Sequence, residues 1–108
     1  PPVADGEIVD EGMFGELMTQ FTLEDSEDPS VATNAASGWA GDWYVTWEDG
    51  PDSTCIRIAY EMDTGLDLDE LEDAYTSWAA PRGATVERLG DRLEVTSCSA
   101  AAGGASPL

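Results

Sequence analysis

Residues 42–62, which read DWYVTWEDGPDSTCIRIAYEM, decide the fold that we expect for this chain. Apolar and polar side chains alternate over residues 42–48 and again over residues 54–62, and this period of two is typical of β-strands. The intervening Asp49-Gly50-Pro51-Asp52 is a strong turn signal. We therefore predict an antiparallel hairpin with one buried face, lined by Trp43, Val45, Trp47, Ile56, Ile58, Tyr60 and Met62.

The apolar period changes to about 3.6 residues after this hairpin, as expected for an amphipathic helix. Asp67 suits the N-cap position with Glu70 as its capping-box partner. Pro81 and Gly83 are typical of the residues that end a helix. The predicted buried stripe of this helix consists of Leu68, Leu71, Tyr75 and Trp78.

A second hairpin is predicted near the end of the chain. Residues 84–89 and 92–98 flank Gly90-Asp91, which has the composition of a two-residue hairpin loop. In that register Val86 lies opposite Val95, and Arg88 lies opposite Leu93.

Before the first hairpin, apolar residues recur at helical spacing from Glu11 to about Leu23, which predicts a short helix. Ser30 suits the N-cap of a second helical turn that ends at Gly38. The apolar positions of the leading helix are Met13, Phe14, Leu17, Met18 and Phe21.

The order of these elements predicts an α+β fold. We expect an antiparallel four-stranded sheet (β-β-α-β-β) with helices packed on one face, preceded by one or two short helices. Residues 1–10 are expected to form an extended acidic lead-in, residues 11–98 a single domain and residues 99–108 a flexible tail.

The composition excludes several functions. The chain has 108 residues, with 23 acidic side chains, four basic ones, no histidine and a formal net charge of −19. Without histidine there is no Ser-His-Asp triad, no Cys-His dyad and no His-ligated zinc, so we expect no enzyme activity in this chain. Phosphate backbones would repel such a domain, so we expect no nucleic-acid partner. No apolar run is long enough for membrane insertion.

The two cysteines, Cys55 and Cys98, carry information on the compartment. Strand parity places both side chains on the sheet face opposite the predicted core, where they can form a disulfide if their strands are neighbours. Two unrelated buried thiols remain the alternative. A disulfide would indicate an oxidising, extracytoplasmic location.

Three residues are candidates for ligand contacts. Trp39 lies between Gly38 and Gly41, before the first strand, where it could form an aromatic platform or pack in a tight turn. With Tyr44 and Arg57 on the expected outer face, it would suit a small-ligand or carbohydrate-binding module.

Asp63, Asp67 and Asp69 are candidates for weak Ca²⁺ binding. Their spacing differs from an EF-hand, because a loop starting at Asp67 would place Leu71 and Trp78 at positions that need oxygen ligands. Helix capping and the helix dipole explain these acids without a metal. We therefore expect no dedicated metal site and no cofactor.

Four stretches of the chain carry a resemblance to known proteins: IVDEGMFGEL (8–17), GWAGDWY (38–44), TCIR (54–57) and WAAPRGATVE (78–87). Together they resemble the C-terminal region of secreted or lipid-anchored actinobacterial proteins of unknown function. In those proteins an upstream segment resembles a zinc metallopeptidase with a His-Glu-x-x-His helix. The resemblance covers residues 8–98 and implies a Cys55–Cys98 pairing and an extracytoplasmic setting. Because this chain has no histidine, no zinc ligand can be carried over to it.

These observations lead to two functional hypotheses. The first is a non-catalytic extracytoplasmic accessory domain, the companion of a metallopeptidase-like domain or another protein, which docks through the leading helix (Phe14, Leu17, Phe21). Ordinary packing of that helix onto its own sheet is the alternative for those side chains. The second hypothesis is the small-ligand or carbohydrate-binding module centred on Trp39.

Overall fold

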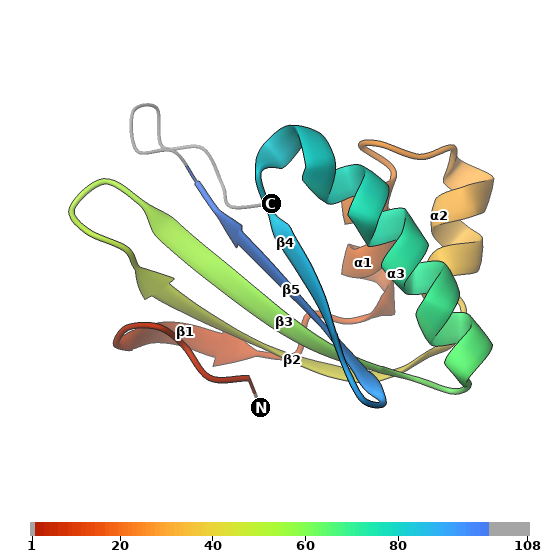
Figure 1. The fold of residues 1–108 in the computed structure, drawn as a ribbon, viewed down its shortest axis with the longest axis horizontal. Helices are drawn as coiled ribbons and strands as arrows, with labels where there is room; N and C mark the ends of the chain where they lie inside the picture. The colour runs from red at the N-terminus through yellow and green to blue at the C-terminus, as the bar shows by residue number, and fades with distance from the viewer. Residues whose placement is uncertain (1, 100–108) are drawn as a thin grey trace.

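The computed structural model describes residues 2–99, which form one five-stranded antiparallel sheet and three α-helices (Figure 1). The strand order across the sheet is β1-β2-β3-β5-β4. In chain order the elements are β1 (Ile8–Gly12), α1 (Glu16–Leu23), α2 (Pro29–Ala36), β2 (Trp39–Glu48), β3 (Thr54–Met62), α3 (Gly65–Ala79), the 3₁₀ helix η1 (Ala80–Arg82), β4 (Thr85–Leu89) and β5 (Arg92–Cys98). Of the tail expected at residues 99–108, all but Ser99 lies outside the described residues.

The prediction of a four-stranded sheet was wrong, because β1 adds a fifth strand at one edge. This strand pairs antiparallel with β2 through a register that shifts between Ile8 and Asp10. Four of its five residues are exposed, so their side chains follow no buried alternation that a pattern search could detect. The strand is defined by its backbone hydrogen bonds to β2, and backbone hydrogen bonds produce no pattern of side chains in the sequence.

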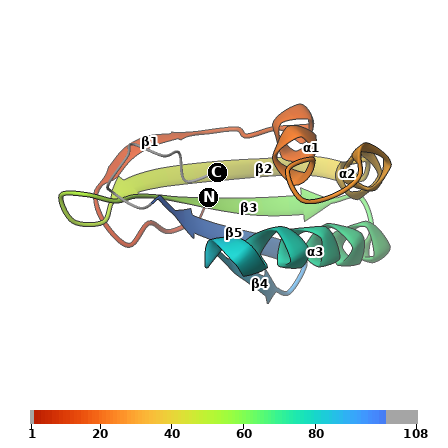
Figure 2. The same cartoon turned by 90° about the horizontal axis from the view of Figure 1, so that it is seen from above.

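The helical layer lies on one face of the sheet (Figure 2). α3 packs on β3, β4 and β5, and α1 and α2 pack against each other and against α3. A row of side chains that runs across four strands lies beneath them: Tyr44, Ile58, Val95 and Val86 are opposite one another in the register. The main core consists of Leu23, Ala32, Ala35, Ile56, Ile58, Tyr60, Leu68, Leu71, Ala74, Tyr75, Trp78, Ala79, Leu93 and Val95.

α3 buries the predicted stripe, but its N-cap differs from the expected one. Thr64 is the N-cap, and its side chain accepts a hydrogen bond from the backbone N–H of Asp67 at 3.1 Å. The Thr64 hydroxyl donates to the Asp67 carboxylate at 2.9 Å. Asp67 thus takes the N3 place of the capping box that had been expected for Glu70. The helix ends at Ala79, and Gly83 follows η1 with a positive φ of 66°.

In the first hairpin, the prediction of one buried face was wrong. The register pairs Tyr44 with Ile58 and Val45 with Arg57, so the odd-numbered residues of β2 point away from the helices. Asp42 and Tyr44 take their place on the helix face. Both faces of this hairpin are therefore partly buried. The apolar residues of β2 that alternate along the strand lie on the face without helices.

The second hairpin has the predicted register. Val86 lies opposite Val95, and Arg88 opposite Leu93. Gly90 in the turn has a positive φ of 62°, which the loop requires and glycine allows. On the helix face, Arg88 forms ion pairs with Asp69 and Glu72 of α3, which join β4 to that helix.

The leading helix begins later than predicted. α1 runs from Glu16 to Leu23, and the expected start at Glu11 lies in β1. α2 begins at Pro29 after Asp28, one residue before the expected cap Ser30. Pro29 stands where its missing N–H costs nothing.

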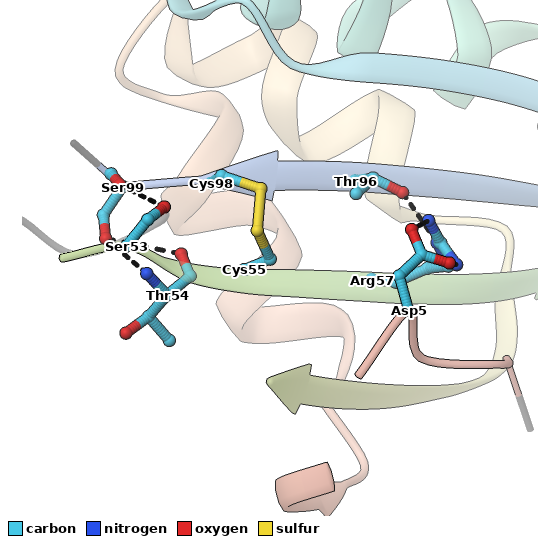
Figure 3. The surroundings of a disulfide bond; sticks show 8 residues. All are labelled: Asp5, Ser53, Thr54, Cys55, Arg57, Thr96, Cys98 and Ser99. Atoms are coloured by element: carbon cyan, nitrogen blue, oxygen red, sulfur yellow. Dashed lines mark hydrogen bonds and ion pairs between the residues drawn. A yellow bond between two sulfur atoms is a disulfide. The ribbon is translucent and has the colours of Figure 1, made fainter. Parts of the chain in front are cut away.

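The face of the sheet without helices is covered in part by residues 2–6, which we call the N-terminal strap. Ala4 packs against a second core cluster of Val45, Trp47 and Cys55. Cys55 of this cluster lies opposite Cys98 of β5 and forms a disulfide with it (Figure 3). The disulfide therefore joins the two neighbouring strands on the face that strand parity had indicated.

Candidate functional site

The most unusual surface lies on α1, where three of the four apolar side chains point away from the protein. Leu17, Met18 and Phe21 are 61%, 50% and 52% exposed, and we call these three residues the α1 face. They lie at i, i+1 and i+4, so they share one side of the helix. Met13, just before the helix, is 65% exposed. The opposite side, which faces the core, carries Thr19 and Thr22 together with Leu23.

Asp42 fixes the start of α1. Its carboxylate accepts hydrogen bonds from the backbone N–H groups of Phe14 at 2.6 Å and Gly15 at 2.8 Å. The indole N–H of Trp39 donates to the same carboxylate at 2.9 Å. Gly15 is the N-cap of α1, so the charged acceptor satisfies the N–H groups of the N-cap and of the residue before it. Gly15 has a positive φ of 92°, which lets the chain turn from β1 into the helix.

A buried chain of hydroxyl groups fixes the rotation of α1. The Thr19 hydroxyl donates to the Gly15 carbonyl at 2.8 Å, so its oxygen accepts from Tyr60, 2.8 Å away. The Tyr60 oxygen lies 2.6 Å from that of Tyr75 on α3. Turning α1 to bury its apolar side would break this chain and leave buried hydroxyls unpaired, which costs about 1–3 kcal/mol for each.

Burial raises the pKa values of Tyr60 and Tyr75 well above the ordinary value for tyrosine. Both rings are fully buried, and the loss of solvation disfavours the phenolate form. The two hydroxyls therefore stay protonated at neutral pH and remain available as donors in the chain. The pKa of Tyr44 is also raised, in this case because its hydroxyl donates to the Asp10 carboxylate at 2.8 Å.

Trp39 and Tyr44 both have partners within the protein. Trp39 packs against the main core while its N–H donates to Asp42. Tyr44 also packs against the main core, with its ring edge-on to Phe14 at 6.4 Å. Both residues therefore contribute to the join between β2 and α1.

Arg57 lies on the other face of the sheet and holds the N-terminal strap. Its guanidinium forms an ion pair with Asp5 at 3.0 Å and donates to the Val3 carbonyl. It also donates to Thr96 at 2.9 Å and lies over the Trp47 ring at 5.0 Å. Figure 3 shows Arg57 between Thr96 and Asp5, on the strand that also carries Cys55. The structure thus separates Arg57 from Trp39 and Tyr44, so the three candidates do not meet in one site.

Two of the three Ca²⁺ candidates have side-chain partners. The Asp67 carboxylate accepts from the Thr64 hydroxyl, and Asp69 pairs with Arg88. For Asp63 the recorded bond is from its backbone N–H to the Gly38 carbonyl, and its side chain is exposed. Within residues 2–99, one group of three metal-ligand side chains lies within 4.8 Å, Asp49 with Cys55 and Cys98. The two sulfurs of that group are joined to each other, so they are not thiolate ligands.

Trp43 is a surface residue that the sequence reasoning placed in the core. It points to the face without helices, beyond the strap, and is 39% exposed. Its indole N–H donates to Glu11 on β1 at 3.1 Å. A hollow of about 260 Å³ beside it is lined by Gly41, Asp42, Trp43, Ala59, Glu61 and Arg92. The exposed position of Trp43 could have been inferred from Asp42, the polar residue before it in the same strand. Because Asp42 points inward, Trp43 points outward.

Fold and surface together define a small two-layer domain of mixed α and β structure, with one disulfide and an apolar helix face turned to solvent. In the described range 2–99, no helix is both long and apolar enough to cross a membrane. A family described as "Domain of unknown function (DUF8575)" matches residues 3–105, and the chain belongs to that family. No curated protein and no solved structure matches the chain.

Proposed function

We propose that this chain is a non-catalytic extracytoplasmic accessory domain that binds a protein partner through the α1 face. The observation that carries the proposal is the exposure of Leu17, Met18 and Phe21 on one side of a helix whose other side is fixed by hydrogen bonds. Clustered exposed apolar side chains on a small domain are typical of protein interaction surfaces. Their spacing suits a helix that inserts into a groove of the partner.

The charge of the chain defines the chemistry of that partner. With a net charge of −19, two copies of this chain repel each other, which opposes self-association through the α1 face. Glu16 and Glu24 lie at the two ends of the helix. A groove with an apolar floor and a rim of lysine or arginine would therefore complement the α1 face.

The extracytoplasmic location is supported by the Cys55–Cys98 disulfide, because disulfides persist in oxidising compartments. The resemblance to secreted or lipid-anchored actinobacterial proteins points to a metallopeptidase-like domain as the partner. The absence of histidine supports a non-catalytic role for this chain beside such a domain. A module centred on Trp39 is not proposed, since that ring packs in the core and its N–H is bonded to Asp42.

The test first asks whether the gene encodes a metallopeptidase-like domain beside this segment, and then measures the binding of that domain. Isothermal titration should give a 1:1 complex, and Leu17→Glu with Phe21→Glu should weaken it at least about tenfold, as expected for central anchors. Leu66→Glu is the matched control, because Leu66 is 79% exposed on α3, away from the α1 face. Binding that survives the double substitution, or a gene without such a neighbouring domain, would contradict the proposal in its present form.

A further inference from the structure

The hollow beside Trp43 lies on the sheet face without helices, beyond the strap. Two rows of the register form its floor. In the first row Trp43, Ala59 and Glu94 lie side by side, and in the second Gly41, Glu61 and Arg92 do. Ala59 and Gly41 are small, so the floor is low between the Trp43 ring on β2 and the polar side chains on β5. A second hollow of about 380 Å³, which shares Glu61 and Arg92, extends it past Met62, Leu89 and Asp91.

The Trp43 ring is positioned before any ligand arrives. Its N–H donates to Glu11 on the edge strand β1, which limits rotation of the indole while leaving part of the ring in solvent. A fixed aromatic face attracts a cation through the negative potential of its π electrons. Because the ring is already held in place, the entropic cost of binding a ligand is lower.

The charges around the hollow favour a cation over an anion. Arg92 is neutralised by its ion pair with Glu94 at 2.8 Å. The Asp42 carboxylate is taken up by three N–H donors. Glu61 is exposed, and among residues 2–99 no hydrogen bond or ion pair engages its carboxylate. A free carboxylate and a fixed indole face therefore line the same hollow, while the one arginine there already has its counter-ion.

We propose that the hollow around Trp43 binds an alkylammonium group, with the cation over the Trp43 ring and its charge compensated by Glu61. The group could be carried by a free amine or by a lysine side chain of another protein. This site lies on the face opposite α1 and does not depend on the accessory role proposed above. Gly41 gives the ligand access, since a Cβ at that position would meet no atom within 4 Å.

NMR titration of the four tryptophan indole N–H signals tests the proposal. Tetramethylammonium chloride and end-capped lysine are the probes, sodium chloride at equal ionic strength is the salt control, and methyl glucoside is the neutral control. The Trp43 signal, assigned by its absence in Trp43→Phe, should shift alone and saturate below about 100 mM probe. Tighter binding of capped lysine would identify a protein side chain as the source, and tighter binding of tetramethylammonium a small free alkylammonium compound.

Three variants separate the contributions of the hollow. Glu61→Gln should weaken binding about two- to fivefold, the range expected for an exposed charge pair. Gly41→Leu places a bulky side chain in the hollow, where a Cβ meets no atom within 4 Å, and should remove saturable binding, while Leu66→Ala should leave it unchanged. The proposal is overturned if sodium chloride gives the same shifts, if methyl glucoside binds more tightly than either cation, or if Glu61→Gln has no effect.

Discussion

The two faces of the sheet are buried by different means. Three helices cover one face and enclose fourteen buried side chains in the main core. The other face has a cluster of three, Val45, Trp47 and Cys55, under a strap without secondary structure. On that face the structure is stabilised by the disulfide between Cys55 and Cys98 and by the contacts of Arg57, whereas the helix face is stabilised by packing.

The disulfide lies on the face of the sheet with the smaller buried cluster. A cluster of three buried residues removes little apolar area from water, and hydrophobic stabilisation scales with that area. A cross-link stabilises by restricting the unfolded chain, whatever area it buries. The molecule thus has its disulfide on the face where apolar burial is smallest.

The largest expected effect is loss of the disulfide. Replacing both Cys55 and Cys98 by serine should lower the free energy of unfolding by about 4 kcal/mol, because the cross-link closes a loop with a sequence separation of 43. Urea unfolding of the oxidised protein and the double variant measures the loss. Reduction of the wild type should reproduce it, and the same reductant should not affect the variant. A loss below about 1 kcal/mol would mean that the strap face holds without its cross-link.

The second effect belongs to the helix face and appears at alkaline pH. The pKa values of Tyr60 and Tyr75 are raised in the folded protein, so above about pH 10 the unfolded chain releases protons that the folded protein keeps. Stability should therefore be constant up to about pH 9 and then fall, with a slope that approaches about 1.4 kcal/mol per pH unit for each of the two tyrosines once the pH exceeds the ordinary pKa of tyrosine. The chain has neither lysine nor histidine to obscure the transition.

Urea midpoints between about pH 8 and pH 11 measure this slope. Tyr75→Phe should make it shallower, whereas Tyr44→Phe, which removes a solvent-exposed hydroxyl, should change it less. If the slope were equally steep in Tyr75→Phe, the buried hydroxyl chain would not be its cause.

The smallest effect concerns the strap. Arg57→Met should cost about 1–2 kcal/mol, because it removes the hydrogen bonds to Val3 and Thr96 as well as the charge over Trp47. Asp5→Asn removes the ion pair alone and should cost less than about 1 kcal/mol, since the Asp5 side chain is 68% exposed. Urea unfolding of the two variants measures both losses. If both variants lost the same free energy of unfolding, the ion pair alone would hold the strap in place.

How far the sequence predicts the structure differs between elements. The stripe of α3 and the register of the second hairpin followed from the sequence, because each depends on residues close together in the chain. Which residues of β2 face the helices could not be predicted from the sequence. The odd-numbered residues of β2 are the more apolar set, and Asp42 turns inward because its carboxylate accepts hydrogen bonds from the N–H groups of Phe14 and Gly15, 28 and 27 residues before it in sequence. 

The candidate site shows the same division. The apolar residues of α1 were singled out from their spacing, yet spacing does not say whether a helix turns its apolar side inward or outward. Thr19, through Tyr60, decides the rotation, and that contact spans 41 residues of sequence. Trp43 was misplaced for a related reason, because Asp42 turns inward to bond Phe14 and Gly15, which are distant in sequence, and its neighbour Trp43 therefore lies on the other face.

By itself the sequence determined the strand and helix periods, the turns, the acidic charge and the absence of histidine chemistry. These are properties of composition and of neighbours along the chain. The tertiary structure alone decided that β1 is a strand, that α1 exposes Leu17, Met18 and Phe21, and that Trp43 borders a hollow. Each of these depends on hydrogen bonds or burial between segments distant in sequence, and the free energy of such contacts exists only once the segments have come together.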